Sequence, residues 1–196
     1  MIFIEKIIST TPSGPTMLTG LSGTYTIDPD HTRIGFVARH AMVTKVRGAF
    51  NQFDGSVTVD GEDLTRSVVG LTIEAASIDT RNEQRDAHLR TNDFLAMEEF
   101  PQITFASTAV RQTGATDLEL TGDLTVKGVT NTVTVPFEFA GSATDPYGNL
   151  RVGFEGTVTI SRKDYGITWN AALETGGVLV SDKVVLEFEV SAIKTA

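Results

Sequence analysis

The segment Thr80–Phe105, TRNEQRDAHLRTNDFLAMEEFPQITF, interrupts a chain that otherwise has the pattern of β-strands, and it concentrates charged residues. Thr80 with Glu83 three residues later matches a capping box, in which each side chain bonds the free backbone N–H of the other residue. We therefore predict a short helix that starts at Thr80. Its apolar residues, Ala87 and Leu89, do not form the stripe of a core-facing helix. The helix is therefore expected to close a space that the strands enclose.

Alternating apolar and polar residues, the mark of a strand with one buried face, recur along the rest of the chain. The alternating sets are Ile34–Ala38, Val57–Val59, Val69–Ile73, Ile103–Phe105, Leu118–Val126, Val133–Phe139, Leu150–Ile160 and Val184–Val190. Turn residues such as Asp54-Gly55 and Asp60-Gly61 separate the strands. Short connections favour antiparallel neighbours. The pattern predicts an all-β fold with one short helical insertion, as an antiparallel up-and-down barrel of about eight strands.

Composition restricts the classes of partner. The chain has 196 residues, with 25 acidic against 16 basic and a net charge of −9. Nucleic acid and anionic membrane surfaces both reward clustered Lys and Arg, so this balance argues against either as a partner. The chain has no cysteine, which excludes disulfides, thiol nucleophiles and cysteine-based metal sites. No apolar run approaches the ~20 residues of a membrane-spanning helix.

The N-terminal residues have a different composition from the rest. Residues 9–23, STTPSGPTMLTGLSG, are polar and rich in Pro and Gly. We predict that residues 1–22 are a flexible lead-in and that residues 23–196 form a single barrel domain, with Met17 an alternative start. Glu5 and Lys6 interrupt the apolar start too early for a secretory signal. A cytoplasmic location is expected.

Several spaced motifs carry a resemblance that runs from Tyr25 to about Val190. They are Tyr25–Asp28, Ile34–His40, Gly48–Phe50 with Phe53–Gly55, Ser77–Thr80, Arg85–Leu89, Asp93-Phe94, Pro101–Phe105, Gly122–Thr130 and Ser161–Ile167. In this order they resemble the YceI-like family of lipocalin-like barrels that bind polyisoprenoids. The chain departs from the family at Phe94-Leu95, where two successive aromatics are frequent. The resemblance implies a lipocalin-like barrel that carries or sequesters a polyprenyl lipid, an isoprenoid quinone or its precursor.

A barrel of about eight strands is either filled by side chains or holds one small ligand. Eleven phenylalanines are spread over nearly every predicted strand, and the single Trp169 continues an alternating set with Tyr165 and Ile167. These rings are either core or the lining of an apolar tunnel. The predicted tunnel residues are Phe36, Phe50, Phe105, Phe154 and Trp169.

A polar ligand head is expected at one mouth of the barrel. Arg81, Arg85 and His88 share one helix face. His40 lies on the same strand face as Ile34, Phe36 and Ala38, which are apolar. A polar ring buried on that face needs a hydrogen-bond partner, and we expect Asp86 or Asp93 to supply it. The predicted mouth residues are His40, Arg85, Asp86, His88 and Phe94. A solvated face with local ion pairs is the alternative.

Two other functions compete with lipid binding. Asp86 and His88 are candidates for an acid/base pair of a small barrel enzyme, but residues two apart on a helix point about 200° apart. Neither a nucleophile elbow nor a phosphate loop is present. A barrel with a filled core that binds a partner protein is the third candidate. The three histidines lack zinc-site spacing, so neither a metal nor a cofactor other than the lipid is expected. Dimerisation through a flat strand face stays open.

Overall fold

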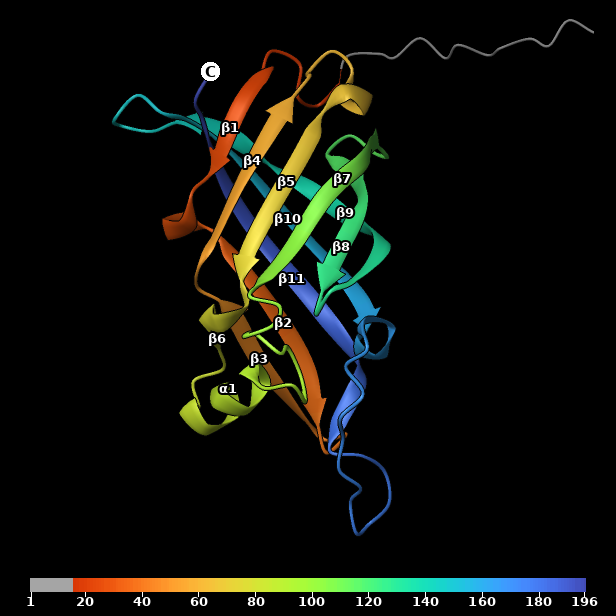
Figure 1. The fold of residues 1–196 in the computed structure, drawn as a ribbon. Helices are drawn as coiled ribbons and strands as arrows, with labels where there is room; N and C mark the ends of the chain where they lie inside the picture. Colours follow the sequence, from red (N-terminus) through yellow and green to blue (C-terminus); the bar gives the residue numbers. More distant parts are fainter. Residues whose placement is uncertain (1–15) are drawn as a thin grey trace, which may run out of the picture.

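The computed structural model describes residues 16–196 and forms one antiparallel sheet of eleven strand segments (Figure 1). The strands are β1 (Gly23–Ile27), β2 (Arg33–His40), β3 (Thr44–Phe50), β4 (Phe53–Val59), β5 (Val68–Glu74), β6 (Ile78–Asp79), β7 (Gln102–Gln112), β8 (Asp117–Val126), β9 (Val129–Thr144), β10 (Leu150–Ser161) and β11 (Val180–Lys194). The helices are α1 (Glu83–Arg90) and the short 3₁₀ turns η1 (Pro29–His31), η2 (Leu64–Arg66), η3 (Ala75–Ser77) and η4 (Arg162–Tyr165).

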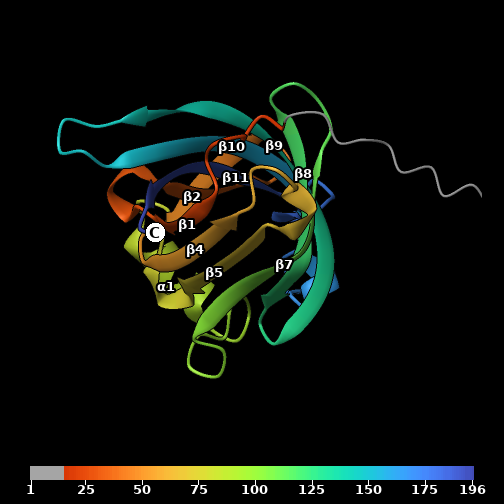
Figure 2. The same cartoon turned by 90° about the horizontal axis from the view of Figure 1, so that it is seen from above.

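The eleven segments occupy eight positions around a closed ring, because three positions are each divided into two segments. β11 pairs with β1 near its end (Tyr25 opposite Lys194) and with β2 in its middle (Phe36 opposite Leu186). β1 pairs with β4, which pairs with β5. β2 pairs with β3, which pairs with β6. Neighbours along the chain are neighbours in the ring, as seen down the barrel in Figure 2. The predicted antiparallel eight-stranded up-and-down barrel with one helical insertion is therefore confirmed.

The upper end of the barrel in Figure 1 carries the C-terminus, and residues 16–22 close it. Leu18 is only 4% exposed and belongs to the core, and the Tyr25 hydroxyl donates to the Leu21 carbonyl at 2.7 Å. The boundary at residue 22 stays a prediction, but in the described part of the predicted lead-in Leu18 packs into the barrel despite its polar, Gly-rich surroundings. Residues 1–15 of the predicted lead-in lie outside the described residues.

The lower end carries α1, the β2–β3 turn and the loop of residues 166–179 (Figure 1). The predicted capping box is wrong. Asn82 caps α1 by accepting from the Arg85 backbone N–H at 2.9 Å. Arg81 has φ +62°, which turns the chain between Thr80 and the helix, so Thr80 lies outside the helix. Its side chain bonds to Asp86 instead of capping.

Candidate functional site

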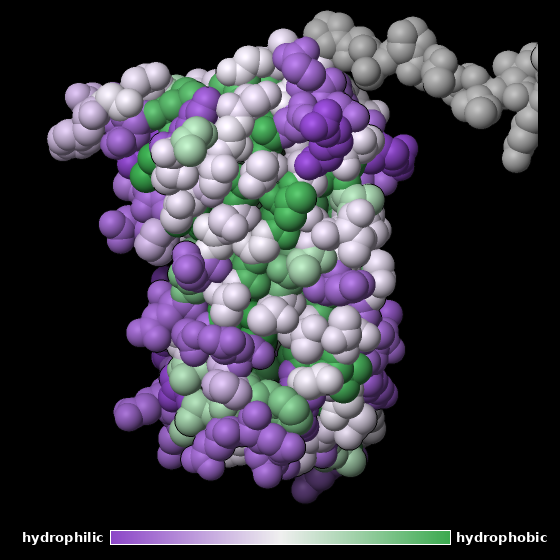
Figure 3. Space-filling model, turned by 45° about the horizontal axis from the view of Figure 1, so that its top comes forward, coloured by the Kyte–Doolittle hydropathy of each residue, from purple (hydrophilic) through white to green (hydrophobic). Residues whose placement is uncertain are grey.

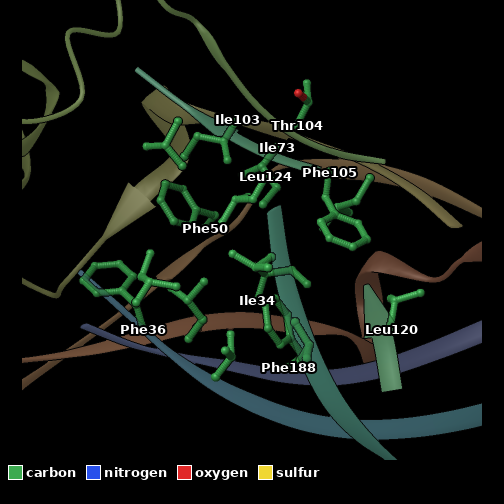
Figure 4. Close-up of a pocket in the computed structure, with 18 of the residues that line it drawn as sticks. Ile34, Phe36, Phe50, Ile73, Ile103, Thr104, Phe105, Leu120, Leu124 and Phe188 are labelled. Carbon is green, nitrogen blue, oxygen red and sulfur yellow. The ribbon is translucent and has the colours of Figure 1, made fainter. Parts of the chain in front are cut away.

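The barrel encloses one long apolar cavity of about 290 Å³. Side chains from almost every strand point into it, as the close-up in Figure 4 shows for Phe36, Phe50 and Phe188. Almost no polar atom of the lining faces the space. The cavity runs between two core clusters, one toward each end of the barrel, and Phe105 packs against both.

The structure brings four of the five predicted tunnel residues into the lining: Phe36, Phe50, Phe105 and Phe154. Trp169 is a correction, because it lies outside the lining in the loop after η4. Gly166 has φ +69° at the end of η4, and the residues after it form a loop instead of a strand. Tyr165 and Ile167 still line the cavity, whereas Trp169 packs against the core cluster beside it. Sequence reasoning missed Leu18 and Leu64, which line the upper end of the cavity.

The outer surface of the barrel can be compared with its interior on one face. Figure 3 shows hydrophilic side chains along the edges of one face and apolar side chains in a seam down its centre. The exposed large apolar residues are few: Met42, Val43, Val68, Val129, Tyr147 and Val178. Among the described residues, large apolar side chains are thus concentrated in the core and the cavity lining, and few are exposed.

The start of α1 is held by a chain of side-chain hydrogen bonds around Thr80. The buried carboxylate of Asp86 accepts from both the backbone N–H and the hydroxyl of Thr80. Arg85 Nε donates to the Thr80 hydroxyl at 2.7 Å, and its other nitrogen donates to the Thr80 carbonyl at 2.9 Å. Arg85 and Asp86, both predicted at the mouth, therefore fasten the helix to the chain before it.

His88 lies in an aromatic cluster at the lower end. Its ring makes edge-on contacts with Phe94, at 5.1 Å between centroids, and with Trp169 at 4.7 Å. Its Nε2 lies 2.8 Å from the Asp93 carboxylate. Phe94 is buried and lines the cavity, so this cluster covers the lower end of the cavity from outside.

Two mouth predictions need correction. His40 is exposed and lies outside the cavity lining. It does not receive the expected hydrogen bond, because Asp86 is bonded to Thr80 and Asp93 to His88. For the same reason Asp86 and His88 are not assembled into an acid/base pair. Trp169, which the alternation predicted as a tunnel residue, lies instead against His88 and Phe94.

Two buried polar side chains flank the lower end of the cavity. The Arg162 guanidinium donates to the backbone carbonyls of residues 167, 169, 180 and 181, and burial lowers its pKa. The Tyr165 hydroxyl is buried without a hydrogen-bond partner among the described residues. Burial raises the pKa of Tyr165, and the Asp164 charge adds to the rise. The neighbouring Asn131 amide donates to the Asp164 carbonyl at 2.9 Å.

A charged network braces the upper half. Arg151 donates to Asp28, and its Nε lies 2.9 Å from the Asp145 carboxylate. The bond from Arg151 holds the pKa of Asp28 below its ordinary value, opposed by burial. The Asn149 side chain and backbone lower the pKa of Asp145 most, and Arg151 adds to this. The network joins η1 to the β9–β10 turn.

Within residues 16–196, no group of three His, Asp or Glu side chains is placed to hold a metal ion. The same part of the chain contains no helix that is long and apolar enough to cross a bilayer.

Comparisons with known proteins agree with this architecture. A family model described as the YceI-like domain matches residues 25–192. A UPF0312 protein of Staphylococcus aureus is 43% identical over 169 residues, which cover 86% of this chain and 95% of that relative. The crystal structure of Burkholderia cenocepacia BcnA has a TM-score of 0.74 at 26% identity, covering 84% of this chain and 98% of BcnA.

A more distant structure bears on the fold. A polyisoprenoid binding domain from Saccharophagus degradans has a TM-score of 0.63 at 14% identity, covering 87% of this chain and 98% of that domain. At this identity the likeness shows a shared fold.

Proposed function

Because this chain belongs to the YceI-like family, we propose that it binds a long-chain isoprenoid lipid inside the barrel and acts as a carrier or sequestering protein. Polyprenyl lipids, isoprenoid quinones and their precursors are the candidate ligands. The observation that carries the proposal is the apolar cavity of about 290 Å³. Each buried CH₂ group contributes about 0.8 kcal/mol, so a long chain binds tightly without strong polar contacts. The polyisoprenoid binding domain of similar fold supports an isoprenoid over a fatty acid.

An empty cavity of this size lowers the free energy of unfolding of a barrel. An apolar cavity without contents lowers stability relative to a filled core, because the lining side chains lose contacts on one side. Globular domains have a total stability of only about 5–15 kcal/mol. Apolar cavities of about 150 Å³ stay dry and take up apolar molecules. A bound hydrocarbon chain would restore the lost contacts, whereas water would not.

The polar head of such a ligand would lie outside the apolar part of the cavity. Burying a polar group without a hydrogen bond costs several kcal/mol, and the lining offers almost no polar atom. At the lower end, His88 with Asp93 is the polar group next to the Phe94 wall. We therefore assign the head-group contact to His88 and Phe94, with Trp169 covering them, while Arg85 and Asp86 position α1.

The two rival functions have less support. A filled-core interaction module requires a barrel without a cavity, which the 290 Å³ space contradicts. The acid/base pair of the enzyme alternative requires Asp86 next to His88, yet each bonds to a different partner. Family membership and the fold neighbours favour binding over catalysis.

The first experiment is organic extraction of the purified protein followed by mass spectrometry. We expect a stoichiometric species built of five-carbon units, which also gives the chain length and the head group. An empty protein that takes up neither added polyprenyl lipid nor quinone would refute the proposal. Cell fractionation tests the cytoplasmic location, which stays a prediction.

A cavity-filling variant makes the test site-specific. Leu120 lines the cavity and is buried, so Leu120→Trp should lower lipid affinity by more than tenfold because the added ring takes the space of the chain. Val129 is exposed at the start of β9, and Val129→Trp is the matched control. Equal affinity of the two variants, with both folded, would place the ligand outside the barrel.

A further inference from the structure

The turn between β2 and β3 exposes apolar side chains at the lower end of the barrel. Met42 is 53% exposed and Val43 is 76% exposed. The Ala41 N–H donates to the Leu179 carbonyl at 2.7 Å, so the turn lies against the loop of residues 166–179. Val178 on that loop is also exposed. We call Ala41, Met42 and Val43 the apolar tip.

The backbone of the apolar tip is unfavourable for its residues. Ala41 and Met42 have φ +49° and +59°, and the Val43 N–H closes the turn onto His40. Two successive positive φ angles occur in hairpin turns that strongly prefer Asn-Gly. Ala and Met therefore add strain and exposed apolar surface without stabilising the turn. Local rules of this kind are broken mostly at functional sites.

Two basic residues behind the apolar tip also destabilise the hairpin. Arg39 and Lys45 lie directly opposite each other across the β2–β3 hairpin, and both are exposed. Like charges in this position destabilise a sheet. Neither forms an ion pair in the described part of the chain, whereas Arg33 and Arg47 share Glu187.

Local charge at the tip opposes the charge of the whole chain. No Asp or Glu occurs from residue 31 to residue 53, although the net charge of the chain is −9. The acidic residues of the adjoining segment are Glu174 and Asp182, and Asp182 already accepts from Ser161 and the Lys163 N–H. The hairpin is therefore a basic region on an acidic protein.

The tip continues the wall of the cavity. Phe36 and Ala38 on β2 line the cavity, as does Val180, which pairs with His40. The exposed apolar residues follow directly beyond these positions. A ligand leaving the lower end of the cavity would thus emerge next to the tip.

We propose that the apolar tip docks on an anionic lipid bilayer, with Met42 and Val43 entering the interface and Arg39 and Lys45 contacting lipid phosphates. Arg39 and Lys45 lie on β2 and β3 directly behind the turn, so basic side chains stand next to apolar groups that enter the interface to a depth of about 5–10 Å. Basic residues near an anionic leaflet add to binding. Repulsion from the acidic remainder is screened beyond about 8 Å at physiological ionic strength. The biological use of docking rests on the proposed lipid binding, because a carrier must load from a membrane.

The test is co-sedimentation of the full chain with vesicles. One set contains phosphatidylcholine alone, and the other contains equal parts of phosphatidylcholine and phosphatidylglycerol. We expect partition onto the anionic vesicles and much weaker partition onto the neutral ones. Absence of partition onto either overturns the proposal and makes a protein the better occupant of the tip.

A double variant separates docking from turn structure. Ala41→Asn with Met42→Gly supplies the residues that the turn prefers, so the unfolding midpoint should rise while vesicle partition falls tenfold or more. The control is Tyr147→Asn, which removes an 89% exposed ring from the β9–β10 turn at the upper end and should leave partition unchanged. Unchanged partition of the double variant would overturn the proposal.

Charge variants and ligand uptake complete the design. Arg39→Gln and Lys45→Gln should each lower partition onto anionic vesicles about fivefold. Polyprenyl lipid delivered from cyclodextrin, without vesicles, should bind the Asn-Gly double variant and the original protein equally. If neither binds it, the proposed function fails while the docking result stands. If the double variant alone loses binding, the tip belongs to the ligand site and the docking proposal fails.

Discussion

Each end of the barrel buries one tyrosine almost completely, and the two hydroxyl groups differ in their bonding. Tyr25 at the upper end is 0% exposed and donates to the Leu21 carbonyl. Tyr165 toward the lower end is 2% exposed, and its hydroxyl has no partner among the described residues. The upper end satisfies its buried polar groups, whereas the lower end leaves one unsatisfied.

The two ends are also closed by different segments. Residues 16–22 lie over the core at the upper end, held by backbone bonds and by side-chain bonds such as that from the Thr16 hydroxyl to the Gly61 carbonyl, and the Thr195 N–H donates to the Thr24 carbonyl. Side chains close the lower end, through Asp86 on Thr80, Arg162 on four carbonyls, and His88 on Asp93. Contacts of single side chains can open locally without unfolding of the strands. The lower end is therefore the end at which we expect ligand exchange.

The largest effect is expected from removing the Arg162 guanidinium. Arg162→Met removes the guanidinium from the carbonyls of residues 167, 169 and 181, whereas the Val180 carbonyl keeps its bond from the Asn170 amide. We expect a loss of about 3–5 kcal/mol, because hydrogen bonds from a charged group are the strong ones and the buried acceptors stay unsatisfied. Urea unfolding measures the loss, and Trp169 fluorescence reports whether the loop detaches.

The control for Arg162 is an exposed arginine. Arg111 pairs with Glu119 at 2.6 Å on the barrel surface, and Arg111→Met should lower stability by less than about 1 kcal/mol. Equal losses for the two variants would mean that the buried guanidinium does not hold the lower end.

The second effect concerns the upper end. Leu18→Ala removes a buried side chain that lies over the cavity. We expect a loss of about 2–3 kcal/mol, at the low end for such truncations because the site already borders a cavity. Leu21→Ala, at a half-buried position, should cost less. Unchanged stability of the Leu18 variant would show that residues 16–22 do not close the barrel.

The same two ends show what the sequence can predict. Strand alternation correctly placed Phe36, Phe105 and Phe154 in the lining, because the period of two fixes the inward face. It could not place Trp169, because the chain after Gly166 is a loop whose path depends on Arg162 bonding the carbonyls of residues 167, 169, 180 and 181.

The roles around the helix were also hidden in the sequence. The sequence pattern indicates that Asp86 is an exposed charge on the helix. In the structure the chain turns at Arg81, so that Thr80 contacts Asp86 and bonds to it. Leu18 stands among polar residues and is buried only by tertiary contact with the barrel end. Local pattern therefore predicts the barrel wall, whereas the closures of both ends depend on contacts between distant segments.

A smaller loss of stability is expected at acid pH. Asp28 and Asp145 have pKa values lowered in the folded protein. Their contribution to stability is therefore complete above the unfolded value of about 3.9 and is lost as the pH falls below it. Hydrogen exchange should show η1 and the β9–β10 turn opening more readily at about pH 3 than at neutral pH.

The variant Arg151→Met tests the cause of that acid sensitivity. It removes the donor that Asp28 and Asp145 share, so the difference in urea midpoint between neutral and acid pH should become smaller. An unchanged difference would assign the acid sensitivity to other carboxylates.

The smallest change in stability is expected from removing the two buried tyrosine hydroxyls, and it should have opposite signs at the two ends. Tyr25→Phe removes a hydroxyl bonded at 2.7 Å and should lower stability by about 1 kcal/mol. Tyr165→Phe removes a buried hydroxyl without a partner, so stability should stay equal or rise by about 0.5–1 kcal/mol. A change of 1 kcal/mol moves the thermal midpoint of a domain this size by about 2–4 °C, which calorimetry resolves. Because both substitutions delete one oxygen from a buried ring, the difference between them isolates hydrogen bonding from packing. A loss on Tyr165→Phe as large as that on Tyr25→Phe would mean that the lower hydroxyl has a partner in solution, and the two ends would then be equally satisfied.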